Sequence, residues 1–311
     1  MIKRTLYFGN PAYLSLNNRN ILIRLPADKK RGIVDEKRDA SVTRTAVIED
    51  VGFVILDNQQ ITITQGLINA LLENNTAILT CNNSHLPSGL LLPLAGNTIQ
   101  TERYRSQIYS SLPLKKQLWQ QTVKAKIANQ AATLRKFTDA ETGNMQAWEK
   151  DVRSGDTFNL EARAAAYYWK NIFPEIKGFL RDPDGDYPNV LLNYGYAIVR
   201  AVIARALVCS GLLPTLGIHH SNRYNAYCLA DDIMEPYRPY VDIKVLEFLK
   251  ANPDVDGLSE IAKRELLSLP VSDVHISGSR RPLMIAAQQT ANSLRKCFDG
   301  ESKTIDYPTL A

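Results

Sequence analysis

A single carboxylate, Glu161, falls on the core-facing side of an expected helix. The stretch from 157 to 173 has helical periodicity. Burying an unpaired carboxylate costs several kcal/mol, so Glu161 needs an arginine, a shifted pKa or a metal ion as compensation. A salt bridge to Arg200 or Arg205 is one open alternative. The residues that share its face are Ala164, Ala165, Tyr168 and Ile172.

A second group of residues that could act in catalysis or metal binding follows a segment rich in Gly and Pro. His219 and His220 end that segment, and Asp232 and Glu235 come later, three residues apart. If residues 229–238 begin a helix, both acids project from one face. Two acids and a histidine can then meet at one site. A solvated acidic face and a hydrogen-bonded structural histidine remain open alternatives.

Glu161, together with a histidine and the acids of this second group, would offer carboxylate oxygens and one imidazole nitrogen to a divalent cation. Carboxylate oxygens suit hard ions, and one imidazole is tolerated better by Mn2+ than by Mg2+ or Ca2+. The sequence contains no G-x-S-x-G elbow, phosphate-binding loop, G-x-G-x-x-G fingerprint or H-E-x-x-H motif. A metal centre is therefore favoured over the other common catalytic schemes.

Positive charge is concentrated in one stretch of the chain. The net charge is only +5, from 37 basic and 32 acidic side chains, but residues 102–136 carry a single acid, Glu102. This stretch could follow a DNA backbone, or it could be a solvated helix face. The candidate phosphate contacts are Lys115, Lys116, Lys124 and Lys126, with Arg280 and Arg281 after a later turn.

The elements that must position these residues fall into two groups along the chain. Up to residue 99, short alternating segments predict strands, with one helix after Thr64. From residue 100 the period becomes helical, beginning with a long amphipathic helix around Trp119. The prediction is an α+β protein with a small, mainly antiparallel β domain over 1–99 and an all-α domain over 100–311. The further helices are expected at 157–173, 190–210, 242–251, 257–268 and 281–298.

Composition excludes several classes of protein. With 45% hydrophobic and 22% charged residues, the chain has an ordinary globular mixture. No uninterrupted apolar stretch is long enough to span a membrane, and the N-terminus lacks the pattern of a signal peptide, so a cytoplasmic location is expected. The cysteines lie far apart, which favours reduced core thiols over a zinc or disulfide framework.

Three motifs, taken together, resemble the CRISPR-associated endonuclease and integrase family Cas1. They cover the chemistry-bearing residues described above, and the resemblance extends over the whole chain. The segment HLPSGLLLPLAGN (85–97) and the Met234-Glu235-Pro236 run suggest the subtype that accompanies a single large RNA-guided effector nuclease. The motifs are Asn159-x-Glu161, Gly211-x-x-Pro214-x-x-Gly217-x-x-His220 and the run from Leu229 to Arg238.

The resemblance implies a site, a reaction and partners. Glu161, His220 and Glu235 would be catalytic ligands of Mg2+ or Mn2+, with Asp232 beside them, whereas His219 has no implied role. Many relatives carry Asp where this chain has Glu235. The implied reaction is attack of a DNA 3′-hydroxyl on a phosphodiester of a CRISPR repeat, which inserts short foreign DNA in antiviral defence. With water as the nucleophile, the same site would act as a nuclease.

The resemblance also implies assemblies. The β domain would form a homodimer, and the chain would bind double-stranded DNA, the small protein Cas2 and, in some steps, the effector nuclease. Two other classes of function stay open at this point. One is a metal-dependent nuclease of DNA repair, and the other is a noncatalytic DNA-binding scaffold in which Glu161 and Glu235 only form salt bridges.

Overall fold

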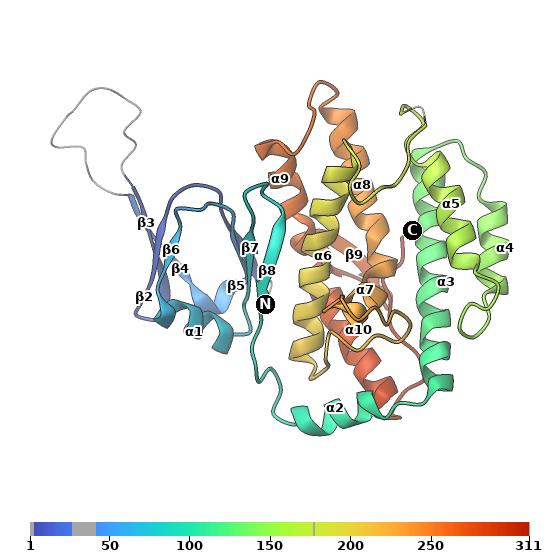
Figure 1. Ribbon diagram of the computed structural model, residues 1–311, viewed down its shortest axis with the longest axis horizontal. Coiled ribbons are helices and arrows are strands. Elements are labelled where there is room, and N and C mark those ends of the chain that lie inside the picture. The colour runs from blue at the N-terminus through green and yellow to red at the C-terminus, as the bar shows by residue number, and fades with distance from the viewer. Residues whose placement is uncertain (1–2, 27–41, 177, 311) are drawn as a thin grey trace. The chain divides into compact units, whose positions relative to one another are not determined.

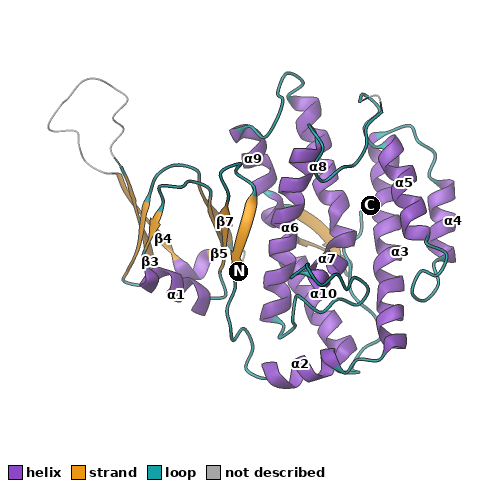
Figure 2. Ribbon diagram, in the orientation of Figure 1, coloured by secondary structure: helices purple, strands orange, loops and turns teal. Residues whose placement is uncertain are grey.

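The computed structural model describes residues 3–26, 42–176 and 178–310 (Figure 1). The chain divides into two compact units between Leu94 and Ala95. This division lies in the Pro- and Gly-containing loop shortly before the predicted boundary at residues 99 and 100. The first unit is built mainly from strands and the second mainly from helices (Figure 2). The predicted α+β class is therefore confirmed.

The described residues of the first unit form two four-stranded sheets and one α-helix. The sheet orders are β1-β5-β7-β8 and β4-β3-β2-β6. Helix α1 (Gln65–Glu73) follows Thr64, whose extended backbone precedes the first turn. The strands are β1 (Arg4–Phe8), β2 (Tyr13–Asn17), β3 (Asn20–Leu25), β4 (Val42–Val47), β5 (Val51–Leu56), β6 (Thr62–Ile63), β7 (Ala77–Cys81) and β8 (Pro87–Leu91), and η1 (Ile48–Asp50) is a short 3-10 turn.

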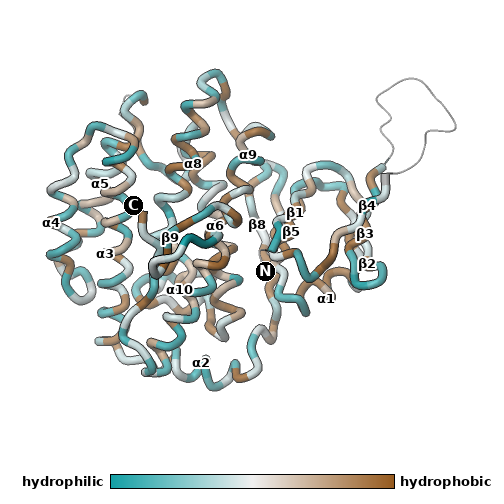
Figure 3. The backbone as a smooth tube through the Cα atoms, turned by 180° about the vertical axis from the view of Figure 1, so that it is seen from behind, coloured by the Kyte–Doolittle hydropathy of each residue, from teal (hydrophilic) through white to brown (hydrophobic). Residues whose placement is uncertain are grey.

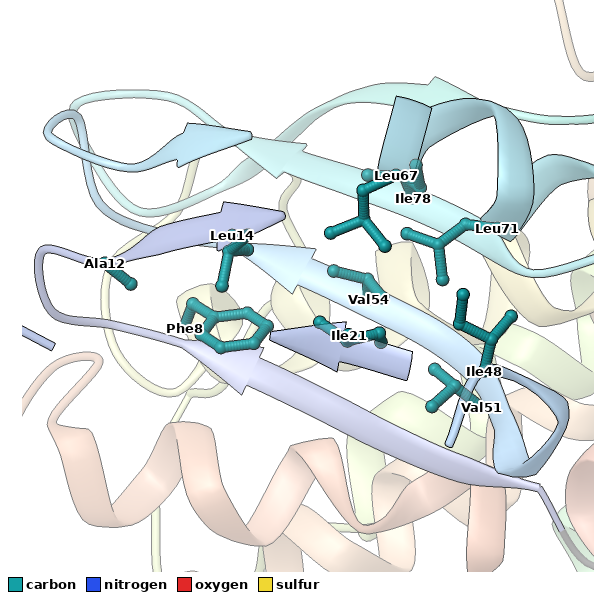
Figure 4. Packing of buried hydrophobic residues seen from close by; sticks show 10 residues of the cluster. All are labelled: Phe8, Ala12, Leu14, Ile21, Ile48, Val51, Val54, Leu67, Leu71 and Ile78. Atoms are coloured by element: carbon teal, nitrogen blue, oxygen red, sulfur yellow. The ribbon is translucent and has the colours of Figure 1, made fainter. Parts of the chain in front are cut away.

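Side chains from both sheets and from α1 form the core of this unit (Figure 4). Alternation along β2 and β3 sends Leu14 and Ile21 inward, while β5 is an almost continuously buried run. The expectation of a mainly antiparallel domain is wrong in part. β5 pairs in parallel with both β1 and β7, and β2 pairs in parallel with β6. The segment predicted as a loop and linker also contains β8, which pairs with β7.

Helices dominate the second unit, and the predicted helices are present with ends shifted by a few residues. The long helix α3 begins after Ser111, whose side chain accepts a bond from the amide of Leu114, and Pro113 lies in its first turn. The helices are α2 (Gln100–Ile108), α3 (Leu112–Phe137), α4 (Gly143–Asp151), α5 (Leu160–Asn171), α6 (Asn189–Cys209), α7 (Cys228–Met234), α8 (Arg238–Ala251), α9 (Glu260–Leu267) and α10 (Leu283–Phe298), with 3-10 turns η2 (Glu235–Tyr237) and η3 (Leu269–Val271).

The second unit is not all-α as predicted, because it contains a β-hairpin. β9 (Asp273–Ile276) and β10 (Ser279–Pro282) pair antiparallel across a two-residue turn. Ser277 and Gly278 both have positive φ, the conformation that a tight hairpin turn requires. The strands are too short to give a clear alternation against the helical segments around them, and the turn was the sole signal in the sequence.

Helix α6 is the centre of this unit. Its length and apolar composition would allow it to cross a membrane, but 78% of its most apolar window is buried inside the protein. Such burial is what the core helix of a globular protein shows. It packs against α7, α8, α9 and α10. Hydrophobic and hydrophilic stretches alternate along the other helices (Figure 3), as expected for helices with one buried face.

Candidate active site

Glu161 lies in the first turn of α5, which begins at Leu160 rather than at the predicted residue 157. The carboxylate of Asp156 caps this turn by accepting bonds from the amides of Leu160 (3.0 Å) and Glu161 (2.9 Å). Asn159, just before the helix, has a left-handed backbone. The cap fixes the start of α5 and therefore the point from which the Glu161 side chain projects.

Glu161 and Glu235 converge on one cation, the ammonium group of Lys126. Lys126 projects from α3, and its Nζ contacts Oε1 of Glu161 and lies 2.6 Å from Oε2 of Glu235. The Lys126 and Glu235 side chains are 9% and 7% exposed, and that of Glu161 is 29% exposed. Three elements far apart in sequence thus bring two carboxylates to one mostly buried positive charge.

Arg238 holds the other oxygen of Glu235. Its Nε donates to Oε1 of Glu235 at 2.9 Å, and its guanidinium lies 4.7 Å from the centre of the Tyr196 ring. Burial opposes ionisation of Glu235, but Arg238 and Lys126 outweigh it and lower the pKa of Glu235 to about 2. Glu235 is therefore a carboxylate at neutral pH despite its burial.

His220 is held by Asp232, a fully buried residue of α7. Nδ1 of His220 lies 2.5 Å from Oδ1 of Asp232, and this bond raises the pKa of His220 against the effect of burial. Because Asp232 engages Nδ1, the other ring nitrogen, Nε2, is the one left to act as a ligand. Asp232 therefore lies beside the proposed ligands and orients one of them.

The loop that carries His220 depends on a close approach at Gly217. A Cβ atom at Gly217 would lie 2.3 Å from the carbonyl oxygen of His220 and 2.8 Å from Oδ2 of Asp232. Both distances are shorter than any side-chain carbon tolerates, so a glycine is required where the loop crosses Asp232. The glycine in the sequence motif thus has a steric reason.

His219, for which the sequence suggested no role, stacks on Trp119. The two ring centres are 4.1 Å apart and the ring planes differ by 1°. His220 meets the same indole edge-on, with ring centres 5.6 Å apart. Trp119 is buried in α3. This tryptophan therefore contacts both histidine rings and limits the positions that the His220 ring can adopt.

Asn129, which the sequence analysis did not single out, ties the glutamate turn to the segment near residue 308. Its Nδ2 donates to the carbonyl oxygens of Pro236 (2.8 Å) and Pro308 (3.0 Å), and its Oδ1 accepts from the amide of Leu310 (3.0 Å). Asn129 lies on α3, one turn after Lys126. A single amide thus fixes the backbone next to Glu235 relative to the helix that carries Lys126.

The residues present suit a divalent cation in their chemistry. Within the described part of the chain, no three His, Cys, Asp or Glu side chains lie close enough together to hold a metal ion. Lys126 instead supplies the positive charge that both glutamates contact. The donor types, two carboxylates and an imidazole oriented by Asp232, nevertheless suit such an ion, and the two carboxylates already share one cation. A metal held by Glu161, His220 and Glu235 requires Lys126 to move aside.

The alternative in which Glu161 pairs with Arg200 or Arg205 is not the arrangement in the structure. Arg200 pairs with Asp231, with its Nε 2.6 Å from Oδ1. Arg205 is a buried residue of the α6 core. The partner of Glu161 is Lys126, on a different helix.

The predicted DNA contacts divide into two groups. Lys115, Lys116 and Lys124 lie on α3 with at least part of each side chain accessible, and Arg280 and Arg281 are exposed on β10. The prediction of Lys126 as a phosphate contact is wrong, because its side chain is buried between two glutamates. Arg280 forms a surface ion pair with Asp273 at 2.8 Å.

Comparisons with known proteins agree with the resemblance in the sequence. The profile described as "CRISPR associated protein Cas1" matches residues 7–253. A CRISPR-associated endonuclease Cas1 from Neisseria meningitidis serogroup C (strain 8013) is 39% identical over 317 aligned positions, covering 100% of this chain and 97% of the relative.

Two solved structures have a similar fold. One is a casposase bound to an integration product, with a TM-score of 0.78 and 16% identity, covering 98% of this chain and 92% of that one. The other belongs to a Cas6-RT-Cas1–Cas2 complex, with a TM-score of 0.72 and 21% identity, covering 97% of this chain and 35% of that one. With the matched profile and the close relative over its full length, these findings show that this chain belongs to the Cas1 family.

Proposed function

We propose that this chain is a metal-dependent DNA endonuclease and integrase that inserts short DNA fragments into a CRISPR repeat array. One observation carries the proposal. Glu161 and Glu235, from α5 and η2, contact one cation, and the oriented imidazole of His220 belongs to the same electrostatic cluster. Two-carboxylate, one-imidazole sites bind Mg2+ or Mn2+, the ions that phosphoryl transfer commonly uses.

The protein side chains have separate tasks in this reaction. Glu161 and Glu235 would hold the cation through carboxylate oxygens, and His220 would hold it through Nε2 while Asp232 keeps Nδ1 engaged. When bound, Mg2+ or Mn2+ would stabilise the negative charge that builds up on the attacked phosphate and on the leaving oxygen. Arg238 keeps Glu235 ionised and directed toward the site.

The chemical step is a direct displacement. The 3′-hydroxyl of the incoming fragment attacks a phosphorus atom of the repeat, a new phosphodiester forms, and the bond to the leaving 3′-oxygen breaks. The number of phosphodiester bonds is unchanged, because one forms as the other breaks. The attacking hydroxyl loses its proton to solvent, and the leaving oxygen takes one up from solvent. Water in place of the 3′-hydroxyl gives hydrolysis, which accounts for endonuclease activity at the same site.

The partners belong to the same proposal. Double-stranded DNA and Cas2 are supported by two relatives in fold, one described as bound to an integration product and the other as part of a Cas1–Cas2 complex. We also propose a homodimer formed by the first unit, contact with an effector nuclease in some steps, and action in the cytoplasm. DNA would follow Lys115, Lys116 and Lys124, with Arg280 and Arg281 as further contacts.

Half-site integration with purified Cas2, Mn2+ and a labelled DNA fragment tests this function. Glu161→Gln, His220→Ala and Glu235→Gln should each abolish joining and cutting while circular dichroism shows an intact fold. The matched control is Glu265→Gln, which removes a carboxylate that pairs with Lys244 at 3.7 Å on the surface. Normal joining by all three site variants would refute the site assignment. Neither joining nor cutting by the wild-type protein, whatever the Mn2+ concentration, would favour a noncatalytic scaffold. Cutting without joining by the wild-type protein would favour a repair nuclease.

A further inference from the structure

Lys126 occupies the space between the two glutamates that the proposed metal would also need. Its Nζ contacts Oε1 of Glu161 and lies 2.6 Å from Oε2 of Glu235. A divalent ion bound to both carboxylates requires oxygen distances of about 2.0–2.6 Å. An ammonium group and a metal ion cannot both lie within such distances of the same two oxygens. The two cations therefore exclude each other at this position.

As long as no metal ion binds there, the local charges favour the position of Lys126 between Glu161 and Glu235. Without Lys126, Glu161 and Glu235 would face each other in a partly buried site, where repulsion between carboxylates is strong. With Lys126 in place, one positive charge neutralises part of this repulsion, and Arg238 neutralises the far side of Glu235. Lys126 is thus a counterion that the protein itself supplies to the two glutamates.

We propose that Lys126 is a tethered competitor of the catalytic metal, which it replaces between Glu161 and Glu235 until a divalent ion displaces its ammonium group. This inference rests on the proposed function, because it takes the metal ligands from there. Lys126 acts on the metal equilibrium and is not a ligand. It weakens metal binding by the DNA-free protein, and it stabilises the fold by reducing the repulsion between the two glutamates.

Of the two glutamates, Glu161 has the more exposed side chain, at 29% against 7% for Glu235. The displaced ammonium would therefore leave on the Glu161 side, carried by the flexible stem of Lys126.

Mn2+ binding to the DNA-free protein tests the inference without any assay of activity. Free Mn2+ is followed by electron paramagnetic resonance during titration of the wild type and of Lys126→Met. Loss of the competing charge should lower the dissociation constant for Mn2+ by about tenfold or more. In a chelator the same variant should melt at a lower temperature than the wild type, and saturating Mn2+ should restore more of its stability than it adds to the wild type.

Two further variants separate competition from simple structural damage. Lys126→Gln is neutral but can still donate a hydrogen bond to Glu161, so it should also bind Mn2+ more tightly than the wild type. Lys250→Met removes a lysine of α8 that lies over the Phe137 ring and contacts neither glutamate, and its Mn2+ affinity should equal that of the wild type. Unchanged or weaker Mn2+ binding by both Lys126→Met and Lys126→Gln would overturn the inference.

Glu235→Gln distinguishes failure of this inference from failure of the proposed function. If the metal site is correct, Glu235→Gln lowers Mn2+ affinity in the wild-type background and also in the Lys126→Met background. Mn2+ binding that Glu235→Gln leaves untouched in both backgrounds would refute the metal site itself. Binding that needs Glu235 but does not respond to Lys126 would refute competition alone.

Discussion

Nδ1 of His220 and Oδ1 of Asp232 lie 2.5 Å apart, and the same carboxylate receives the backbone of the loop that carries His220. The amides of Ile218 and His219 donate to Oδ2 at 2.7 and 2.9 Å, and the amide of His220 donates to Oδ1 at 3.2 Å. One buried side chain thus sets both the course of the loop and the orientation of the imidazole.

Replacing Asp232 should harm stability as well as catalysis. Asp232→Ala leaves three amides and one ring nitrogen without their acceptor. The amide of Ile218 is buried, and an unsatisfied buried donor costs about 1–3 kcal/mol. We expect urea denaturation to report a loss of at least about 1–3 kcal/mol in the free energy of unfolding, together with loss of DNA joining. Asp232→Asn keeps one oxygen acceptor and should lose less stability. Wild-type stability in Asp232→Ala would contradict this role.

A buried carboxylate that is not among the proposed ligands, Asp242, should make stability fall as pH rises. Burial raises its pKa from 3.8 to about 6, although the hydroxyls of Tyr168 and Tyr196 donate to it. Between these two pH values the folded state holds a proton that the unfolded state has lost. Stability from this group is therefore complete below about pH 4 and is lost as pH rises through about 6.

The variant Asp242→Asn tests this pH dependence because its side chain stays neutral. The shift from 3.8 to about 6 corresponds to about 3 kcal/mol. Urea denaturation should therefore show Asp242→Asn gaining stability relative to the wild type between about pH 4 and pH 7. A difference between the two proteins that does not change with pH would refute the shifted pKa.

Salt dependence tests whether the start of α3 follows DNA. Each lysine that contacts a phosphate displaces counterions, so log affinity falls linearly with log salt concentration. Changing Lys115 and Lys116 together to Gln should reduce the slope by up to about 1.8, with a similar loss of affinity on every DNA sequence. Lys244→Gln, at a lysine paired with Glu265, is the control and should leave the slope unchanged. Equal slopes for all three proteins would identify this part of α3 as a solvated face.

The proposed homodimer can be tested on the first unit alone. Residues 1–94 form a compact unit with their own hydrophobic core, and among the described strands β4 and β8 are the last in the order of their sheets. If dimerisation resides here, this fragment should sediment as a dimer, because its edges and apolar faces would otherwise be left in water. A folded, monomeric fragment would count against dimerisation through this unit.

The sequence predicted the elements of the first unit better than their pairing. Alternation in β2 and β3 identifies the face that is buried, but it does not say which strand lies beside which. The continuous apolar run of β5 was a usable signal, since strands buried between two parallel neighbours lose the alternation. Pairing depends on contacts between distant segments, which local periodicity cannot encode.

Within the site, the helical spacing of α3 could have predicted that Lys126 is buried, whereas counting the charges of this stretch could not. Lys126 lies seven residues after Trp119, two helical turns along the same face of α3, and this spacing places it on the buried side. A lysine on a core face requires acidic partners, just as Glu161 on its own core face requires a cation. The sequence offered both halves of this ion pair, but their meeting depends on how α3 and α5 pack.

Gly217 carries no chemistry, yet the close approach around it has a genetic consequence. Any side chain there would collide with the His220 carbonyl or with Asp232. A random-mutagenesis screen for cells that no longer acquire new spacers should therefore recover substitutions at Gly217 as often as substitutions at the residues proposed to hold the metal. Alleles of Gly217 would look like active-site alleles in such a screen, and purified variants would differ from them by their lowered melting temperature.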